Sequence, residues 1–165
     1  MDIEDSIIDV ADAFGPDYTD LAPEGEAHFD PVTVATVLAC HILYAVGAGI
    51  RDGITEAAKD GTVAVLQATG RHIGDRLIPA RIRDFFAKES GPADQAAAQR
   101  QAADSLTAAA ASVGQLDPAV IAQLVTVTAT AVAQALQTAG LKDQATQRVA
   151  QTIEAQVKIT LTPVA

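Results

Sequence analysis

The residues best suited to chemistry are few, and their spacing does not gather them into a catalytic site. Cys40 and His41 are adjacent, and neighbours on a helix point about 100° apart, so they cannot form a nucleophile–base pair. Cys40 is the only cysteine, and its apolar surroundings are typical of an inert core residue. His41 is interpreted as a buried, hydrogen-bonded histidine, with a pH-responsive group in an apolar seam as the alternative. His28, His41 and His72 lack the close spacing of a metal site. We therefore predict a non-enzyme with no catalytic or metal-binding residues.

Residues 47–53 contain three glycines, as a phosphate-binding loop can. Such a loop follows a strand, and its third glycine would fall at position 52. That position is Asp52, whose carboxylate would repel a phosphate, and no alternation of strands and helices follows. The sequence therefore predicts no cofactor.

Charge is distributed unevenly along the 165 residues, whose formal net charge is −10. Residues 1–30 carry acidic groups and no Lys or Arg, whereas the remainder is balanced. This acidity argues against nucleic acid as a partner. One cluster of basic residues stands out, and we interpret it as a solvated face. The alternatives are a surface that pairs with the acidic arm of residues 1–30 or with an acidic partner, and a surface that lies against anionic lipid. The cluster consists of Arg71, Arg76, Arg81, Arg83 and Lys88.

The element that organises the rest is a predicted helix over residues 32–61, opened by Asp30-Pro31. Bulky residues recur every fourth position, which gives a ridge, and small residues form a groove beside it. The predicted packing interface in this groove consists of Ala45, Gly49, Gly53, Ala57 and Gly61. Glycine weakens a helix interior, so a break near Gly47-Ala48-Gly49 is the alternative to one continuous helix.

Further helices are predicted on both sides of this one from apolar periodicity and from Gly and Pro boundaries. They cover residues 2–14, 62–78, 80–88 (a short helix or turn), 92–113, 118–139 and 142–156. The expected apolar line of the 92–113 helix is Ala103, Leu106, Ala110 and Val113. The 118–139 helix has no formal charge but a polar stripe: Gln123, Thr126, Thr130, Gln134 and Gln137.

The last residues alternate between apolar and polar, which predicts a half-buried strand capable of pairing through Val157, Ile159 and Leu161. The fold class is therefore all-α: a single compact bundle of about five to six helices with a long central hydrophobic helix and a short strand-like C-terminal tail. Residues 1–30 form an acidic N-terminal arm with a short amphipathic helix, which either docks on the core or detaches. Residues 31–165 form the bundle, with a seam considered at 89–93.

Two function classes remain. The first is a non-enzymatic helical protein–protein interaction or self-assembly module, binding a protein partner or a second copy. A regulator or effector in a bacterial conflict or toxin pathway would fit this class and the alternative below. The composition, low in Lys and rich in Ala, suggests a GC-rich bacterial genome. The alternative is a membrane-active module that inserts through residues 32–50 when triggered, because that segment is apolar and carries no Asp, Glu, Lys or Arg. The acidic first residues are not typical of a secretory signal, so we expect a cytoplasmic protein, with peripheral membrane association as the variant.

Overall fold

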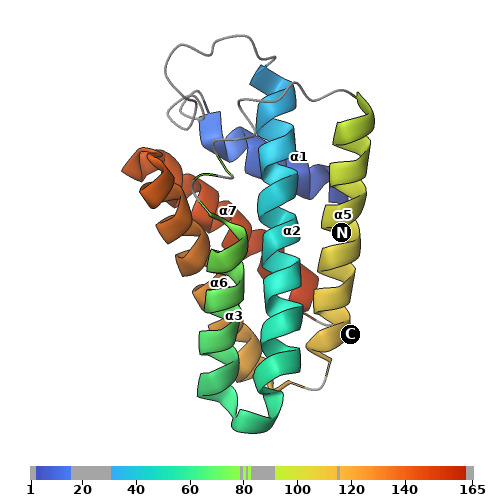
Figure 1. Ribbon diagram of the computed structural model, residues 1–165, viewed down its shortest axis with the longest axis vertical. Helices are drawn as coiled ribbons and strands as arrows, with labels where there is room; N and C mark the ends of the chain where they lie inside the picture. The colour runs from blue at the N-terminus through green and yellow to red at the C-terminus, as the bar shows by residue number, and fades with distance from the viewer. Residues whose placement is uncertain are drawn as a thin grey trace.

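The protein is an all-α bundle, as the sequence predicts (Figure 1). The computed structural model describes residues 3–15, 31–78, 80, 82, 92–114 and 116–162. Six α-helices lie within these residues: α1 (Ile3–Phe14), α2 (Pro31–Ala57), α3 (Thr62–Arg76), α5 (Pro92–Ser112), α6 (Pro118–Ala139) and α7 (Asp143–Leu161). The predicted short element at 80–88 lies outside the described residues except at positions 80 and 82, and so does most of the seam considered at 89–93.

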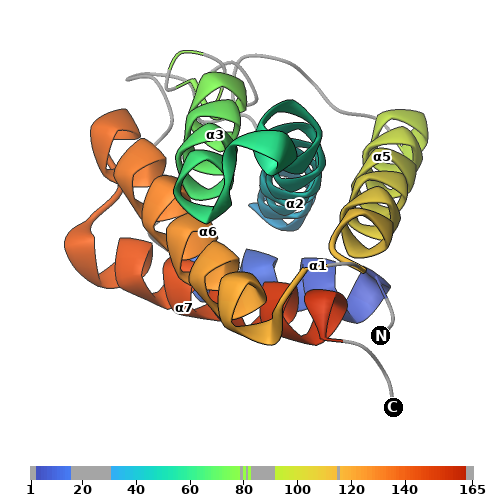
Figure 2. The same ribbon diagram turned by 90° about the horizontal axis from the view of Figure 1, so that it is seen from below.

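Helix α2 is the central helix, flanked by α3 and α5, with α1 and α7 together on one further side (Figure 2). Its ridge residues Leu38, Ile42 and Ile50 are fully buried. The helix is continuous through its glycines for 27 residues, which is about 40 Å. It ends at Ala57, and residues 58–60 form one 3-10 turn, so it is shorter than the predicted 32–61 helix.

The boundaries of α6 follow the expected Asp-Pro start and Gly end. Helix α6 begins after Asp117, with Pro118 in its first turn. It ends at Gly140, whose φ of 114° is the left-handed conformation that glycine adopts readily. The N–H of Leu141 returns to the carbonyl oxygen of Leu136 at 3.0 Å, which satisfies a terminal acceptor of the helix.

Helix α1 is docked on α2 and α7. Ile7, Val10 and Phe14 are almost completely buried on one face of α1. Polar contacts with α7 add to this docking: the Ser6 hydroxyl donates to Gln156 Oε1 at 2.7 Å, and the Gln156 amide donates to Asp9 Oδ2 at 3.1 Å. Residues 16–30, the rest of the predicted arm, lie outside the described residues.

The predicted C-terminal strand is wrong, because helix α7 continues to Leu161. Val157 and Leu161 are buried four residues apart and extend the inward face begun by Ala145, Val149 and Ile153. Ile159 points away and is 57% exposed. A five-residue alternation is too short to distinguish the two-residue period of a strand from the 3.6-residue period of a helix. Burial of one face against the bundle favours the helix.

The predicted apolar line along α5 is right at Leu106 and Val113, which are buried, and wrong at its two alanines. Its fully buried residues include Ala102 and Ala109, whereas Ala103 and Ala110 are only half-buried. The reason is Ser105, which is buried and whose hydroxyl donates to the carbonyl oxygen of Tyr44 at 2.7 Å. A serine does not count as apolar in a hydrophobic pattern, so the sequence favours Ala103 and Ala110 over their neighbours Ala102 and Ala109.

Candidate functional site

The predicted small-residue groove of α2 is filled by α3 of the same chain. A Cβ atom added at Gly53 would lie 2.6 Å from the backbone nitrogen of Thr69 and 2.7 Å from its Cα. One added at Gly49 would lie 3.0 Å from the backbone nitrogen of Ile73. The other buried members of the row are Ala45 and Ala57. These residues are therefore not exposed to a second protein in the folded bundle.

Gly61, the last residue of the predicted row, does not pack. It follows the end of α2, is exposed, and has a φ of 102°, with no atom within 4 Å of an added Cβ. Its role is to let the chain turn between α2 and α3. Sequence reasoning missed that Gly47 also packs closely: an added Cβ would lie 2.6 Å from the carbonyl carbon of Ser105 on α5. The sequence carried a signal for this contact, because Gly47 weakens the interior of a helix as Gly49 does, and close packing can offset that cost.

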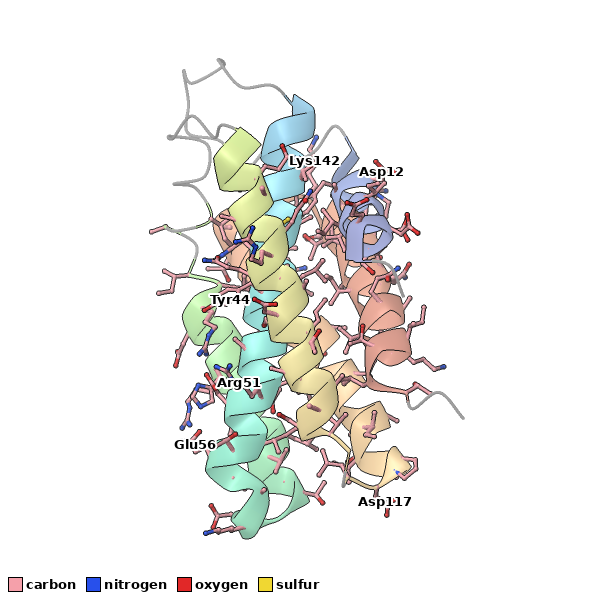
Figure 3. All side chains as sticks on the ribbon, turned by 90° about the vertical axis from the view of Figure 1, so that its right-hand side faces the viewer. Asp12, Tyr44, Arg51, Glu56, Asp117 and Lys142 are labelled. Carbon is pink, nitrogen blue, oxygen red and sulfur yellow. The ribbon has the colours of Figure 1, made fainter. Side chains whose placement is uncertain are left out.

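Two arginines of the predicted basic group pair with acids of α2. Arg76 contacts Asp52, and Arg71 contacts Glu56. Glu56 also lies 2.7 Å from His72 Nε2. Figure 3 shows Glu56 and Arg51 on this side of α2. Arg81, Arg83 and Lys88 lie outside the described residues.

These ion pairs lower the pKa values of the two carboxyl groups. Burial raises the pKa of the Asp52 carboxyl, but the hydrogen bond from Arg51 and the charges of Arg76 and Arg51 outweigh it, so the pKa is below its ordinary value. Hydrogen bonds from Arg71 and His72 lower the pKa of Glu56. Both acids are therefore ionised at neutral pH, and the pairs join α2 to α3.

Cys40 and His41 do not form a reactive pair. Cys40 is fully buried, and this burial raises the pKa of its thiol to about 11, so the sulfur is protonated at neutral pH. His41 and Tyr44 border a recess of about 80 Å³ between α2 and α5, too small for an ordinary ligand. In the described parts of the chain, no three His, Cys, Asp or Glu side chains are placed to hold a metal ion.

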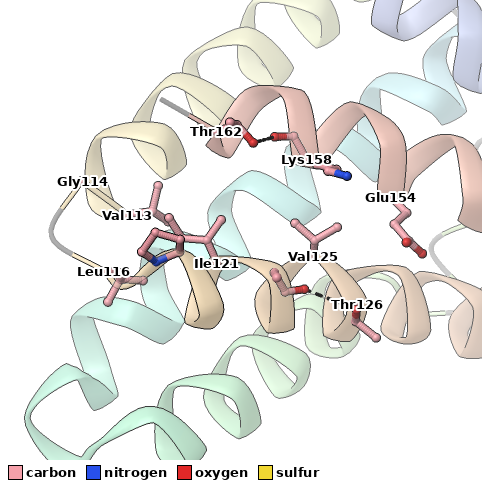
Figure 4. Close-up of a pocket in the computed structure, with 11 residues that line it drawn as sticks. Val113, Gly114, Leu116, Ile121, Val125, Thr126, Glu154, Lys158 and Thr162 are labelled. Atoms are coloured by element: carbon pink, nitrogen blue, oxygen red, sulfur yellow. Dashed lines mark hydrogen bonds between the residues drawn. The ribbon is translucent and has the colours of Figure 1, made fainter. Parts of the chain in front are cut away.

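A groove of about 380 Å³ lies between the residues that follow α5, the first half of α6 and the end of α7 (Figure 4). Val113, Leu116, Ile121 and Val125 supply apolar walls, and the remaining lining residues are Gly114, Pro118, Ala122, Thr126, Glu154, Lys158 and Thr162. Its floor is apolar and its rim carries one carboxylate and one ammonium group. The groove joins elements far apart in the sequence, so sequence reasoning did not find it.

The groove adjoins the outward face of α6, which differs chemically from the exposed faces of the other described helices. The residues along the middle of this face are exposed and uncharged: Ala119, Gln123, Thr126, Thr130, Gln134 and Gln137. Each other described α-helix exposes at least one charged side chain, such as Asp5, Arg51, Arg71, Asp104 and Glu154. In Figure 3, Asp117 and Lys142, which bound the charge-free segment, lie towards opposite ends of the molecule.

Two of the described helices are long and apolar enough to cross a membrane, by length and composition alone. In the span Ala35–Asp60, 78% of the most apolar window is buried, as in the core helix of a soluble bundle. In Pro118–Ala139 the buried share is 33%. The second helix is thus the more accessible of the two.

Comparisons with known proteins add no family: no family model, no curated protein and no solved structure matches the chain.

Proposed function

We propose that this protein is a non-enzymatic helical interaction or assembly module whose docking surface is the outward face of α6 together with the adjoining groove. The observation that carries the proposal is the contrast between this face and the rest of the surface. A chain with a net charge of −10 presents here a whole exposed helix face without a formal charge. Cores of protein interfaces are depleted of charged side chains in the same way.

Physical chemistry gives a reason for such a face. Charged side chains keep soluble proteins apart, and a long face without them is where a partner can approach without burying an ion. The Gln and Thr side chains offer donors and acceptors that a partner can satisfy, at a smaller desolvation cost than a charge. The groove beside the face adds apolar walls in which a partner's side chain can anchor.

The test is the size of the native species in a gently prepared extract of the source cells. The wild-type chain, of 17.0 kDa, is expected in a larger complex. A Gln123→Glu/Thr130→Glu variant is expected to shift to the size of the free chain, because it places two charges on the face. The matched control is Gln101→Glu/Thr107→Glu on α5, where the residues are also exposed, and it should elute as the wild type does.

Surface changes of this kind alter folding by at most about 0.5 kcal/mol, so all variants should keep the wild-type helical spectrum. A wild-type chain that elutes at its own size would contradict the proposal. So would an α6 variant that elutes with the wild type.

Membrane insertion is the second candidate, and the large exposed share of the apolar helix α6 is the observation that favours it. Gly47, Gly49 and Gly53 of α2 already pack against α5 and α3. Flotation with anionic vesicles between about pH 5 and pH 8, where a histidine titrates, separates the candidates. An interaction module stays in the aqueous fraction, and stable flotation would favour insertion.

A further inference from the structure

The groove beside α6 carries two opposite charges above an apolar floor. Val113, Ile121 and Val125 are buried and form that floor. Glu154 and Lys158 are exposed and lie one turn apart on α7, so both reach the same side of the groove. Figure 4 shows these two side chains on α7, with Val125 facing them from α6.

The two charges are not paired with each other. A Glu four residues before a Lys is the favoured order for a salt bridge on a helix. Yet neither Glu154 nor Lys158 takes part in any of the ion pairs found in the described parts of the chain. Exposed pairs of this kind are weak, so a ligand that contacts both charges can replace their mutual contact at little cost. The groove therefore presents a carboxylate and an ammonium group that are both open to a ligand.

The hydroxyl groups on the rim of the groove are acceptors. The Thr126 hydroxyl donates its proton to the carbonyl oxygen of Ala122 at 3.3 Å. The Thr162 hydroxyl donates its proton to the carbonyl oxygen of Lys158. Each hydroxyl oxygen can still accept a hydrogen bond but has no proton left to donate. Thr126 on α6 and Glu154 on α7 thus offer acceptors from both sides of the groove, which suits the three N–H groups of an ammonium.

From this arrangement we infer that the groove binds a free α-amino acid with an apolar side chain. The ammonium group of the ligand lies against Glu154, its carboxylate against Lys158, and its side chain over the apolar floor. The groove volume of about 380 Å³ lies within the range of roughly 300–1,000 Å³ found for small-molecule sites. The inference goes beyond the proposed function, because it concerns the groove alone and needs no protein on the α6 face.

Other classes of ligand match the groove less well. An apolar amine without a carboxylate would meet the ammonium group of Lys158, and an apolar carboxylate without an amine would meet the carboxylate of Glu154. A phosphate group would bring more negative charge than one lysine can balance, in a chain whose net charge is −10. A zwitterion satisfies both rim charges, and because it has no net charge the overall field of the protein does not repel it.

NMR spectra of the full chain, titrated with L-leucine up to about 20 mM, test the inference. The methyl and amide signals of Ile121 and Val125 should shift and saturate, with a dissociation constant of about 1 mM. Each of three analogues lacks one part of leucine: isoamylamine lacks the carboxylate, isocaproate lacks the ammonium group, and glycine lacks the apolar side chain. Each analogue should bind at least about tenfold more weakly, because a charge-assisted hydrogen bond or the burial of apolar surface is lost.

Variants of the rim separate the two charge contacts. Glu154→Gln should weaken leucine binding about tenfold but leave isocaproate binding no weaker, since isocaproate has no ammonium group to lose its partner. Lys158→Gln should likewise weaken leucine binding and leave isoamylamine binding no weaker. Asp104→Asn on α5 is the control, because Asp104 is exposed and does not line the groove, and it should bind leucine as the wild type does.

Unchanged signals up to the highest leucine concentration would overturn the inference, and so would equal binding of leucine and its analogues. Shifts confined to residues outside the groove, or leucine binding that both rim variants leave unchanged, would overturn it as well. None of these results touches the proposed function, because the native complex and its loss in the Gln123→Glu/Thr130→Glu variant are measured separately. Conversely, leucine binding by a chain that the extract yields only in free form would support the ligand site and refute the interaction function.

Discussion

Replacing Gly53 by alanine should destabilise the bundle, although alanine is the better helix former. The intrinsic gain of Gly→Ala inside a helix is about 1 kcal/mol. Against it stands the contact with α3, where the new Cβ would lie 2.6 Å from the backbone nitrogen of Thr69 and 2.7 Å from its Cα. Real Cβ atoms do not approach other atoms so closely, so α2 and α3 must separate.

The magnitude follows from what must move. Overpacking typically costs about 1–3 kcal/mol, and the upper end applies because backbone rather than a flexible side chain is in the way. Subtracting the helix gain leaves a net loss of about 2 kcal/mol, or roughly 4–8 °C in melting temperature for a chain of this size. Gly74, in α3, is the matched control, because an added Cβ there meets nothing within 4 Å. Gly74→Ala should therefore stabilise by up to about 1 kcal/mol.

Thermal and urea unfolding followed by circular dichroism measure both changes. Combining Gly53→Ala with Thr69→Ala should not restore stability, since the backbone of residue 69 remains in place. If Gly53→Ala is as stable as Gly74→Ala, the two helices do not approach as closely as described, and the packing account of α2 is wrong.

Three further outcomes are expected. Thr128→Val should raise the free energy of unfolding by about 1 kcal/mol, because the buried Thr128 hydroxyl has no hydrogen-bond partner among the described residues. Thr146→Val should lower the free energy of unfolding, because it removes a hydrogen bond to the Leu141 carbonyl oxygen. Equal effects of the two substitutions in urea unfolding would contradict this. The pKa of Asp52 is lower in the folded chain than in the unfolded chain, so its carboxylate stabilises the fold at pH values above the unfolded pKa, and acidification removes this stabilisation. The difference in free energy of unfolding between wild type and Asp52→Asn should therefore shrink from about pH 5 to about pH 3. A constant difference would refute the role of the Asp52 ion pairs. Cys40, with a thiol pKa of about 11, should react with a disulfide reagent at pH 8 only when the protein is unfolded, and rapid reaction of the native protein would disprove its burial.

Local features of the fold were predictable because they depend on neighbours in the sequence. The apolar face of α1, the Asp117-Pro118 start of α6 and the Gly140 end all follow from residues within one or two turns. The ridge of α2 follows from a single period maintained over many turns. Where the pattern was short, as at Val157–Leu161, two periods fitted equally and the sequence predicted the wrong one.

Long-range pairings were not predictable. The groove of α2 was visible in the sequence, but nothing local says that Gly53 meets Thr69 or that Gly47 meets Ser105. The groove beside α6 likewise exists only because α5, α6 and α7 converge. The polar stripe of α6 was visible as a pattern, yet its meaning depends on exposure, which the sequence does not give.

The central claim is that the outward face of α6 contacts another protein chain, and a photo-reactive phenylalanine analogue at position 130 tests it most directly. The account predicts a covalent adduct with a second protein chain on irradiation of the source cells, and no comparable adduct from the same residue placed at position 107 on α5. Equal yields from the two positions, or none from position 130, would contradict it.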